Sequence, residues 1–402
     1  MSSASTTTES DQKAWWHDIL AGARPDHDGA PMPGSGRRET YLLFPSATDP
    51  RQVVDASSSR LLAAELGRVP AGSSPAAGAA RRVASVGAGL GLARVLRPNR
   101  LVIESTPTAT LAGRLAELFE RDRVRLSLAA GPVRPNRKPV ARVLDESGAL
   151  LGVAKIGWDL ATRALIDREA AALHDAAELP EPFITPVARG LIDVGSLRVL
   201  ALDPIDIPDD RIDPVAIDPE VEATGILAAP RPQPVPLADT PFLISMTERL
   251  VRHERGAELR GLIDRLAAVS GHDPTLVGRA HGDWAPWNIR RVPAGLLVWD
   301  WERFASGVPV GFDLAHHRYS VRRPGSPDVA TSAARAESDL RELVPRLDLD
   351  PDDAGRLVLF QLMELATRHV ESGFAEDLSE ETSGLLNEIE RRLTVLNRHD
   401  PC

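Results

Sequence analysis

The alternation of apolar and polar residues divides the chain into a strand-rich first half and a helix-rich second half. Short period-two segments, typical of strands with one buried face, alternate in the first half with patterns of the helical period. The predicted strands cover residues 39–46, 51–55, 100–105, 123–131, 139–148, 150–159, 183–195 and 196–205. The predicted helices of this half cover residues 58–68, 108–122 and 161–177.

The second half is predicted to be mostly helical. Residues 203–241 are rich in proline and aspartate, and proline removes ladder donors and interrupts helices, so this segment is predicted to be a linker or a loosely packed insertion. Beyond it, helical patterns cover residues 242–253, 257–271, 329–347, 354–372 and 381–398, with one apolar strand at 295–302. The pattern therefore predicts an α+β fold with two lobes, an antiparallel sheet with one helix followed by a mostly helical lobe.

Four segments follow from these patterns. Residues 1–38, rich in Ser, Thr, Gly, Pro and Asp and without periodicity, are predicted to be a disordered tail. Residues 39–120 form an N-terminal α/β extension, a further subdomain of unknown role. Residues 121–205 form the sheet lobe, and residues 206–402 form the helical lobe with its catalytic loop.

A glycine-rich stretch inside the extension, RVASVGAGLGLARVL, superficially resembles a nucleotide-binding loop. A dinucleotide fold would require a clear strand before Gly87, Gly89 and Gly91 and an acidic residue about twenty positions further on. Glu104 is poorly placed for that role. The stretch is therefore interpreted as an ordinary passage from a loop into a helix.

Composition and charge restrict the classes of protein. The chain has 402 residues, of which 43% are hydrophobic and 26% charged, as in an average globular protein. The net charge of −10 argues against a nucleic-acid binder, which needs clustered Lys and Arg. Cys402 is the only cysteine, and neither a signal-peptide pattern nor an apolar run of about 18 residues is present. We expect a cytoplasmic protein without membrane or nucleic-acid partners, and the oligomeric state stays open.

Lysine is rare in this chain. Of the 47 basic residues only Lys13, Lys138 and Lys155 are lysines. Where arginine is the usual cation, a lysine within a predicted strand indicates a need for the compact ammonium group of lysine. Lys155, in the strand LLGVAKIGW, is such a residue.

The strongest chemical signal is HGDWAPWNI at 281–289, followed by VWDWE at 298–302. A turn presents Asp283 and Asn288, and the end of the returning strand presents Asp300 and Glu302 on one face. Carboxylate and amide oxygens converging from adjacent loops suit Mg²⁺. His281 has no second His or Cys at metal spacing, so it is predicted to be a structural residue that hydrogen-bonds the loop.

These motifs resemble the catalytic core of the aminoglycoside phosphotransferase and choline kinase family, whose members have a protein-kinase-like fold. The resemblance implies that Asp283 orients or deprotonates the attacking hydroxyl, and that Asn288 and Asp300 bind Mg²⁺. Glu302 matches an acidic residue common in this element, where it could contact a metal-bound water or the substrate. The following GVPVGFDLAHH resembles the family's "DLA" element and implies that Asp313 is a structural brace.

The sheet lobe carries a second match. Kinase-like folds pair a strand lysine with a helix glutamate, and Glu169 follows Lys155 by fourteen residues on the predicted helix. The resemblance implies that Lys155 contacts the nucleotide phosphates and that the backbone from Ala201 through Asp203 to Pro204 faces the base. A solvent-facing Lys155 and a merely solvated Glu169 are the alternatives.

The resemblance thus implies a small-molecule kinase that uses ATP or GTP with Mg²⁺. Its acceptor would be a small hydroxylated compound, namely a sugar, an aminoglycoside or amino sugar, or an amino alcohol. The alternative is a catalytically inactive, nucleotide-binding regulatory protein of the same fold. His316, His317 and Tyr319 either line the acceptor pocket or pack structurally.

Overall fold

The computed structural model divides the chain into two compact units. The first comprises residues 1–170 and 186–206, and the second comprises residues 171–185 and 207–402. The structure describes residues 9–22, 37–45, 50–68, 75–91, 99–105, 110–131, 136–181, 183–205, 218, 221–229, 233–253, 256–292, 294–323, 326, 328–372 and 379–399.

The first unit is built on one antiparallel sheet in the order β3-β1-β2-β4-β5-β6-β9-β8. Its strands are β1 (Arg37–Phe44), β2 (Gln52–Asp55), β3 (Arg100–Ser105), β4 (Arg125–Ala129), β5 (Val140–Leu144), β6 (Leu150–Gly157), β8 (Ala188–Val194) and β9 (Leu197–Leu202).

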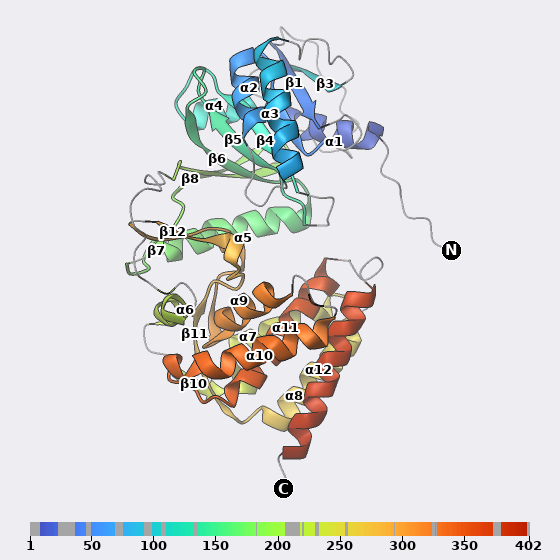
Figure 1. Cartoon of the computed structure of the whole chain (residues 1–402), viewed down its shortest axis with the longest axis vertical. Helices are drawn as coiled ribbons and strands as arrows, with labels where there is room; N and C mark the ends of the chain where they lie inside the picture. The colour runs from blue at the N-terminus through green and yellow to red at the C-terminus, as the bar shows by residue number, and fades with distance from the viewer. Residues whose placement is uncertain are drawn as a thin grey trace, which may run out of the picture. The chain divides into compact units, whose positions relative to one another are not determined.

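Helices cover both faces of this sheet because successive side chains of a strand point to opposite sides. On β1, Tyr41 and Leu43 pack with α1 (Glu9–Ala21) and α4 (Leu111–Leu118) in the main core. Leu42, between them, packs instead with α2 (Ser59–Gly67) and α3 (Pro75–Gly89). Figure 1 shows α2 and α3 side by side over the strands of the extension.

The sequence predicted a disordered tail over residues 1–38, and this is wrong for helix α1. Trp16 is fully buried, and its indole Nε1 donates a hydrogen bond to Pro50 O over 3.0 Å. The Arg137 guanidinium lies 4.4 Å from the Trp15 ring centroid and donates to Gln12 Oε1 over 3.2 Å. The apolar contacts of one helix face, too short to give a periodic signal, order this segment. Residues 1–8 and 23–36 of the predicted tail lie outside the described residues.

The N-terminal extension contains helices and strands as predicted, but its strands continue the sheet of the predicted sheet lobe, residues 121–205. β2 pairs with β4, so that Val53 lies opposite Leu128 and Val54 opposite Ser127. The glycine-rich stretch falls largely inside α3, which contains Gly87 and Gly89. Over residues 82–89 it is therefore helical rather than a loop that leads into a helix, and residues 92–96 lie outside the described part of the chain.

The second unit is mostly helical. Its core joins the buried faces of α7 (Pro241–Val251), α8 (Gly256–Ser270), α9 (Phe312–Arg322), α10 (Val329–Leu343), α11 (Asp353–Glu371) and α12 (Ser379–His399) (Figure 1). Two three-stranded sheets accompany the helices. One contains β10 (Gln233–Pro236), β11 (Pro274–Ala280) and β14 (Ala305–Pro309), and the other contains β12 (Ile289–Val292), β13 (Gly295–Val298) and β7 (Phe183–Ile184).

The proline-rich segment 203–241 is more ordered than a linker over its second half. Helix α6 (Val221–Ala228) buries Val221 and Leu227, and Leu237 is fully buried. Strand β10 carries Pro234 and Pro236 at the edge of its sheet, where a missing N–H costs no ladder bond. Residues 206–217 lie outside the described part of the chain.

The predicted fold class is confirmed: the chain is α+β, with an antiparallel sheet in the first unit and a mostly helical second unit. Helix α5 (Leu160–Ala176), the helix predicted beside the sheet, begins in the first unit and ends in the second. None of the helices in the described part of the chain combines the length and the apolar character that a bilayer crossing requires.

If α1 is part of the folded core, Trp16→Ala is expected to lower the free energy of unfolding by about 3–5 kcal/mol. The matched control is Trp287→Ala, because the Trp287 side chain is 61% exposed, and its expected effect is within about 0.5 kcal/mol. Urea unfolding measures both values. Equal midpoints for the two variants would show that α1 contributes nothing to stability.

Candidate active site

A buried ion pair joins the sheet of the first unit to helix α5. Lys155, in the middle of β6, is 8% exposed, and Glu169 on α5 is fully buried. The ammonium Nζ lies 2.5 Å from Glu169 Oε1. These positions exclude both alternatives, a solvent-facing lysine and a solvated glutamate. Because a buried charge is costly unless it is paired, each side chain fixes the position of the other.

The backbone predicted to face the nucleotide base, from Ala201 to Pro204, spans the end of strand β9. Ala201 lies within β9 between Ala154 of β6 and Gly190 of β8, so its peptide groups belong to the sheet. The N–H of Asp203 donates to Val187 O over 2.9 Å, and its carboxylate accepts from Arg189 Nε at 2.6 Å. The backbone of this segment is thus hydrogen-bonded within the sheet as far as Asp203 N, and its position beside a nucleotide base stays a prediction. Residues 132–135, in the loop between β4 and β5, lie outside the described part.

In the second unit, the carboxylate of Asp313 fixes the backbone of the loop after β11. Asp313, at the start of α9, accepts hydrogen bonds from His281 N at 2.6 Å and Gly282 N at 2.9 Å. Burial raises the pKa of Asp313 to about 6, and these two N–H donors oppose that rise. Gly282 has φ 80°, and a Cβ there would lie 2.4 Å from Arg303 O, so this turn requires glycine. Asp313 thus sits where a structural brace would.

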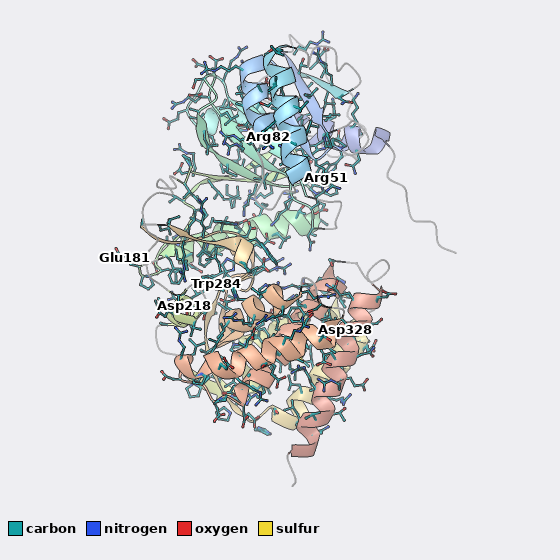
Figure 2. The ribbon with its side chains drawn as sticks, in the orientation of Figure 1. Arg51, Arg82, Glu181, Asp218, Trp284 and Asp328 are labelled. Atoms are coloured by element: carbon teal, nitrogen blue, oxygen red, sulfur yellow. The ribbon has the colours of Figure 1, made fainter. Side chains whose placement is uncertain are left out.

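His281 is a buried, neutral part of this loop. Its Nδ1 accepts from Asp283 N over 3.2 Å, so its Nε2 carries the proton and donates to Trp299 O over 3.1 Å. Burial lowers the pKa of His281 to about 4, although the nearby Asp283 and Asp300 favour the charged form. The ring packs edge-on against two buried indoles, Trp284 (Figure 2) and Trp301, with centroids 5.6 and 4.7 Å away. Those two tryptophans are therefore core residues.

A β-hairpin brings the two predicted metal ligands together. Asn288 directly precedes β12 and Asp300 follows β13 by two residues, and the strands pair so that Ile289 faces Val298. Trp299 N donates to Asn288 O over 3.2 Å, which extends the pairing to the end of the hairpin. Asp300 has φ 64° and ψ 54°, a left-handed conformation uncommon outside glycine and typical of functional turns. Glu302 lies half-buried in the next turn.

Asp283 is surrounded by hydrogen-bond donors. Asn288 Nδ2 lies 2.9 Å from its Oδ2, and His316 Nε2 and Arg368 Nη1 lie 3.1 and 3.4 Å from its Oδ1. Burial alone would raise the pKa of Asp283, but His316, followed by Arg368 and His281, holds it well below its usual range. The side chain is still 33% exposed. It is therefore an ionised, fixed carboxylate that a ligand can reach.

Sequence reasoning missed the support that α11 gives to this carboxylate. Gln361 Nε2 lies 2.8 Å from His316 Nδ1, and Arg368 Nη2 donates to Gly282 O over 2.5 Å. Glu364 accepts from Arg368 Nε at 2.8 Å and is itself bound by Arg249. The signal was present in RLVLFQLMELATRHVE, where Gln361, Glu364 and Arg368 recur at helical spacing on one face of the helix. The sequence left open whether His316 lines the acceptor pocket or packs structurally. In the structure it contacts Asp283 directly.

The oxygen atoms that Asn288 and Asp300 present beside the hairpin suit a Mg²⁺ ion that takes its other ligands from phosphates and water. Asn288 uses its Nδ2 on Asp283, so its Oδ1 is the atom suited to a cation, and Asp300 supplies a carboxylate. Within the residues that the structure describes, no three His, Cys, Asp or Glu side chains could hold a metal by themselves. Mg²⁺ commonly takes one or two protein oxygens and completes its shell with waters and substrate phosphates.

Comparison with known proteins gives structural likeness only. No family model matches the chain, and no curated protein matches it. A thermostable mutant of an aminoglycoside phosphotransferase is 14% identical, with 71% of this chain and 99% of that one covered and a TM-score of 0.46. A choline/ethanolamine kinase family protein from Mesorhizobium loti is 13% identical, with 67% and 87% covered and a TM-score of 0.39.

A glucosamine kinase in complex with glucosamine, ADP and inorganic phosphate is 19% identical, with 75% of this chain and 89% of that one covered and a TM-score of 0.35. The resemblance predicted from the sequence thus has counterparts among solved structures of a phosphotransferase and of kinases. At these identities the likeness concerns the fold.

The low pKa of His281 has a consequence for stability. Between the unfolded value near 6.5 and the folded value near 4, the unfolded chain holds one more proton, so stability falls as pH falls through this window. The free energy of unfolding of the unaltered protein exceeds that of His281→Gln by an amount that should be about 2 kcal/mol larger at pH 7.5 than at pH 5. Urea unfolding at both pH values measures it, with the exposed His174→Gln as control. A gap that does not change with pH would contradict a buried neutral ring.

The Gln361 contact predicts the tautomer of His316. Because Gln361 Nε2 donates to Nδ1, the ring proton should reside on Nε2, which faces Asp283. Long-range ¹H–¹⁵N correlation spectra of histidine-labelled protein report this directly. In Gln361→Glu, the new carboxylate accepts rather than donates, so a proton is expected on Nδ1. A proton on Nδ1 in the unaltered protein would contradict the assignment.

Proposed function

We propose that the chain is a small-molecule kinase that transfers the γ-phosphoryl group of ATP or GTP to a hydroxyl of a small acceptor. The observation that carries this proposal is the state of Asp283, an ionised carboxylate held by three donors yet one-third exposed. Phosphoryl transfer asks the protein mainly to position the acceptor and to balance charge. A fixed carboxylate at the surface of a rigid loop suits the first task.

Asp283 would accept a hydrogen bond from the acceptor hydroxyl through the exposed part of its carboxylate. Since its pKa lies well below the usual range, the group stays ionised at neutral pH and is a weak base. Its main contribution would be to orient the oxygen for in-line attack, with proton transfer late in the reaction. His316 and Arg368 would keep the carboxylate in one orientation and so act as positioning residues.

Lys155 and Glu169 support the nucleotide part of the proposal. A buried lysine paired with a helix glutamate is the arrangement with which kinase-like folds bind the α- and β-phosphates. Lys155 would bind these phosphates, and Glu169 would fix the direction of the ammonium group. Asn288 and Asp300 would hold Mg²⁺, which neutralises charge on the phosphate oxygens when bound.

The acceptor is proposed at the level of chemical class, as a sugar, an aminoglycoside or amino sugar, or an amino alcohol. A nucleotide-binding regulator without activity is the competing function. Loss of catalysis usually removes the need for an oriented aspartate, whereas here Asp283, Asn288 and Asp300 are all present and the first two are hydrogen-bonded. The intact set favours the enzyme.

The proposal is tested by ADP release across aminoglycosides, glucosamine, maltose, choline and homoserine in the presence of Mg²⁺. One class of acceptor is expected to stimulate release, and Asp283→Asn is expected to lower the stimulated rate by about 10²–10⁴-fold while nucleotide binding persists. Asp264→Asn, at an exposed position on α8, is the matched control and should leave the rate unchanged. Nucleotide binding without stimulation by any acceptor would favour the regulator, and near-normal turnover of Asp283→Asn would reject the role of this residue.

A further inference from the structure

Lys138, one of the three lysines of this chain, lies just before strand β5 and has no role in the chemistry proposed above. Both of its neighbours are anchored. The carbonyl of Arg137 accepts from Trp158 Nε1 over 2.9 Å, and the carbonyl of Pro139 accepts from Ile156 N over 3.0 Å. A proline that follows a residue favours an extended backbone at that residue. The backbone of Lys138 therefore continues the line of β5.

The side chains of this segment alternate between the two faces of the sheet. Arg137 is 8% exposed, and its guanidinium lies 4.4 Å from the Trp15 ring centroid, on the face covered by α1. Ala141, four residues further on, is buried in the core that contains α1, whereas Lys138 and Val140 are half-buried. Because successive side chains of an extended chain point to opposite sides, Lys138 and Val140 share the face turned away from α1.

That face also carries Lys155. In the pairing of β5 with β6, Val140 lies directly opposite Lys155. Residues directly opposite each other in an antiparallel pair point to the same side, with their Cβ atoms about 4.5–5.5 Å apart. Ala154 and Ile156, the two neighbours of Lys155, are buried in the core with α1, as the alternation requires. Lys138 thus lies on the face of Lys155, on the adjacent strand and two residues beyond its partner.

The register also gives the order of groups along this face. The end of β9, predicted to lie beside the base, pairs with β6 so that Leu202 faces Val153, two residues before Lys155. Lys138 extends from Val140 in the opposite direction along β6, because β5 and β6 are antiparallel. A nucleotide with its base at the end of β9 and its α- and β-phosphates at Lys155 therefore directs its terminal phosphate toward Lys138.

We propose that Lys138 is a second phosphate-binding lysine, whose ammonium group binds oxygens of the β- and γ-phosphates. The inference rests on the proposed kinase function and deepens it. A lysine ammonium is a compact charge with three rotatable donors, and its hydrogen bonds to phosphate are charge-assisted. During transfer the acceptor oxygen bonds to the γ-phosphorus, the bond from phosphorus to the bridging oxygen breaks, and the electron pair stays on the nucleoside diphosphate. Lys138 neutralises the charge that develops on that oxygen.

The test is isothermal titration calorimetry of the full chain with Mg²⁺ and the tri-, di- and monophosphates of adenosine and of guanosine, which requires no acceptor. Lys138→Met is expected to weaken binding of the triphosphate by at least about tenfold and that of the diphosphate less. Binding of the monophosphate, which has neither a β- nor a γ-phosphate, should not change. Lys155→Met is expected to weaken the triphosphate and the diphosphate alike, and Lys138→Arg, which keeps the charge, should restore part of the affinity.

The matched control is Lys13→Met, because Lys13 lies on α1, which packs against the other face of the sheet. It should leave every affinity unchanged, and urea unfolding should show that Lys138→Met is folded under the conditions of the titration. Unaltered triphosphate binding in Lys138→Met, or an equal loss for all three nucleotides, would overturn the inference and leave the kinase proposal standing. Failure of the unaltered protein to bind any nucleotide would overturn both.

Discussion

The geometry of the second unit depends on the hydrogen bonds that Asp313 accepts from His281 N and Gly282 N. A buried carboxylate is tolerated only where donors compensate for its lost hydration, and here two peptide groups of the loop after β11 provide that compensation. The start of α9 and the end of β11 are thereby fixed to each other. The positions of Asp283 and of the hairpin beyond it follow from this connection, since the chain between them is short.

Around Asp283, each polar group takes its orientation from the next. Gln361 sets the tautomer of His316, Glu364 holds Arg368, and both donors end on a single oxygen of the aspartate. In such a network the members restrict each other's orientation, because turning one group leaves another buried without a partner. Helix α11 thus stabilises a loop eighty residues away in sequence, and the carboxylate needs no reorganisation when a ligand arrives.

Much of this site could be predicted from the sequence because its residues occupy local patterns. The loop motif placed Asp283, Asn288 and Asp300 within twenty residues, and the rarity of lysine singled out Lys155. The contribution of Gln361 and Arg368 could not be predicted, because it depends on which face of α11 meets the loop. Strand periodicity likewise does not tell that β9, which carries Ala201, has neighbours on both edges. The order of helix α1 likewise depends on distant contacts, those with Pro50 and Arg137.

The continuity of the sheet across the extension restricts how this chain can be shortened. A chain that began near residue 121 would keep every residue of the proposed chemistry but would turn β4 into an open edge strand. Leu126 and Leu128 on that strand, both fully buried, would lose the cover of Val53 and α4. Exposed apolar edges recruit strands from other chains, so aggregation rather than a smaller active protein is the expected fate. The extension therefore covers the edge of β4 in the lobe that carries Lys155.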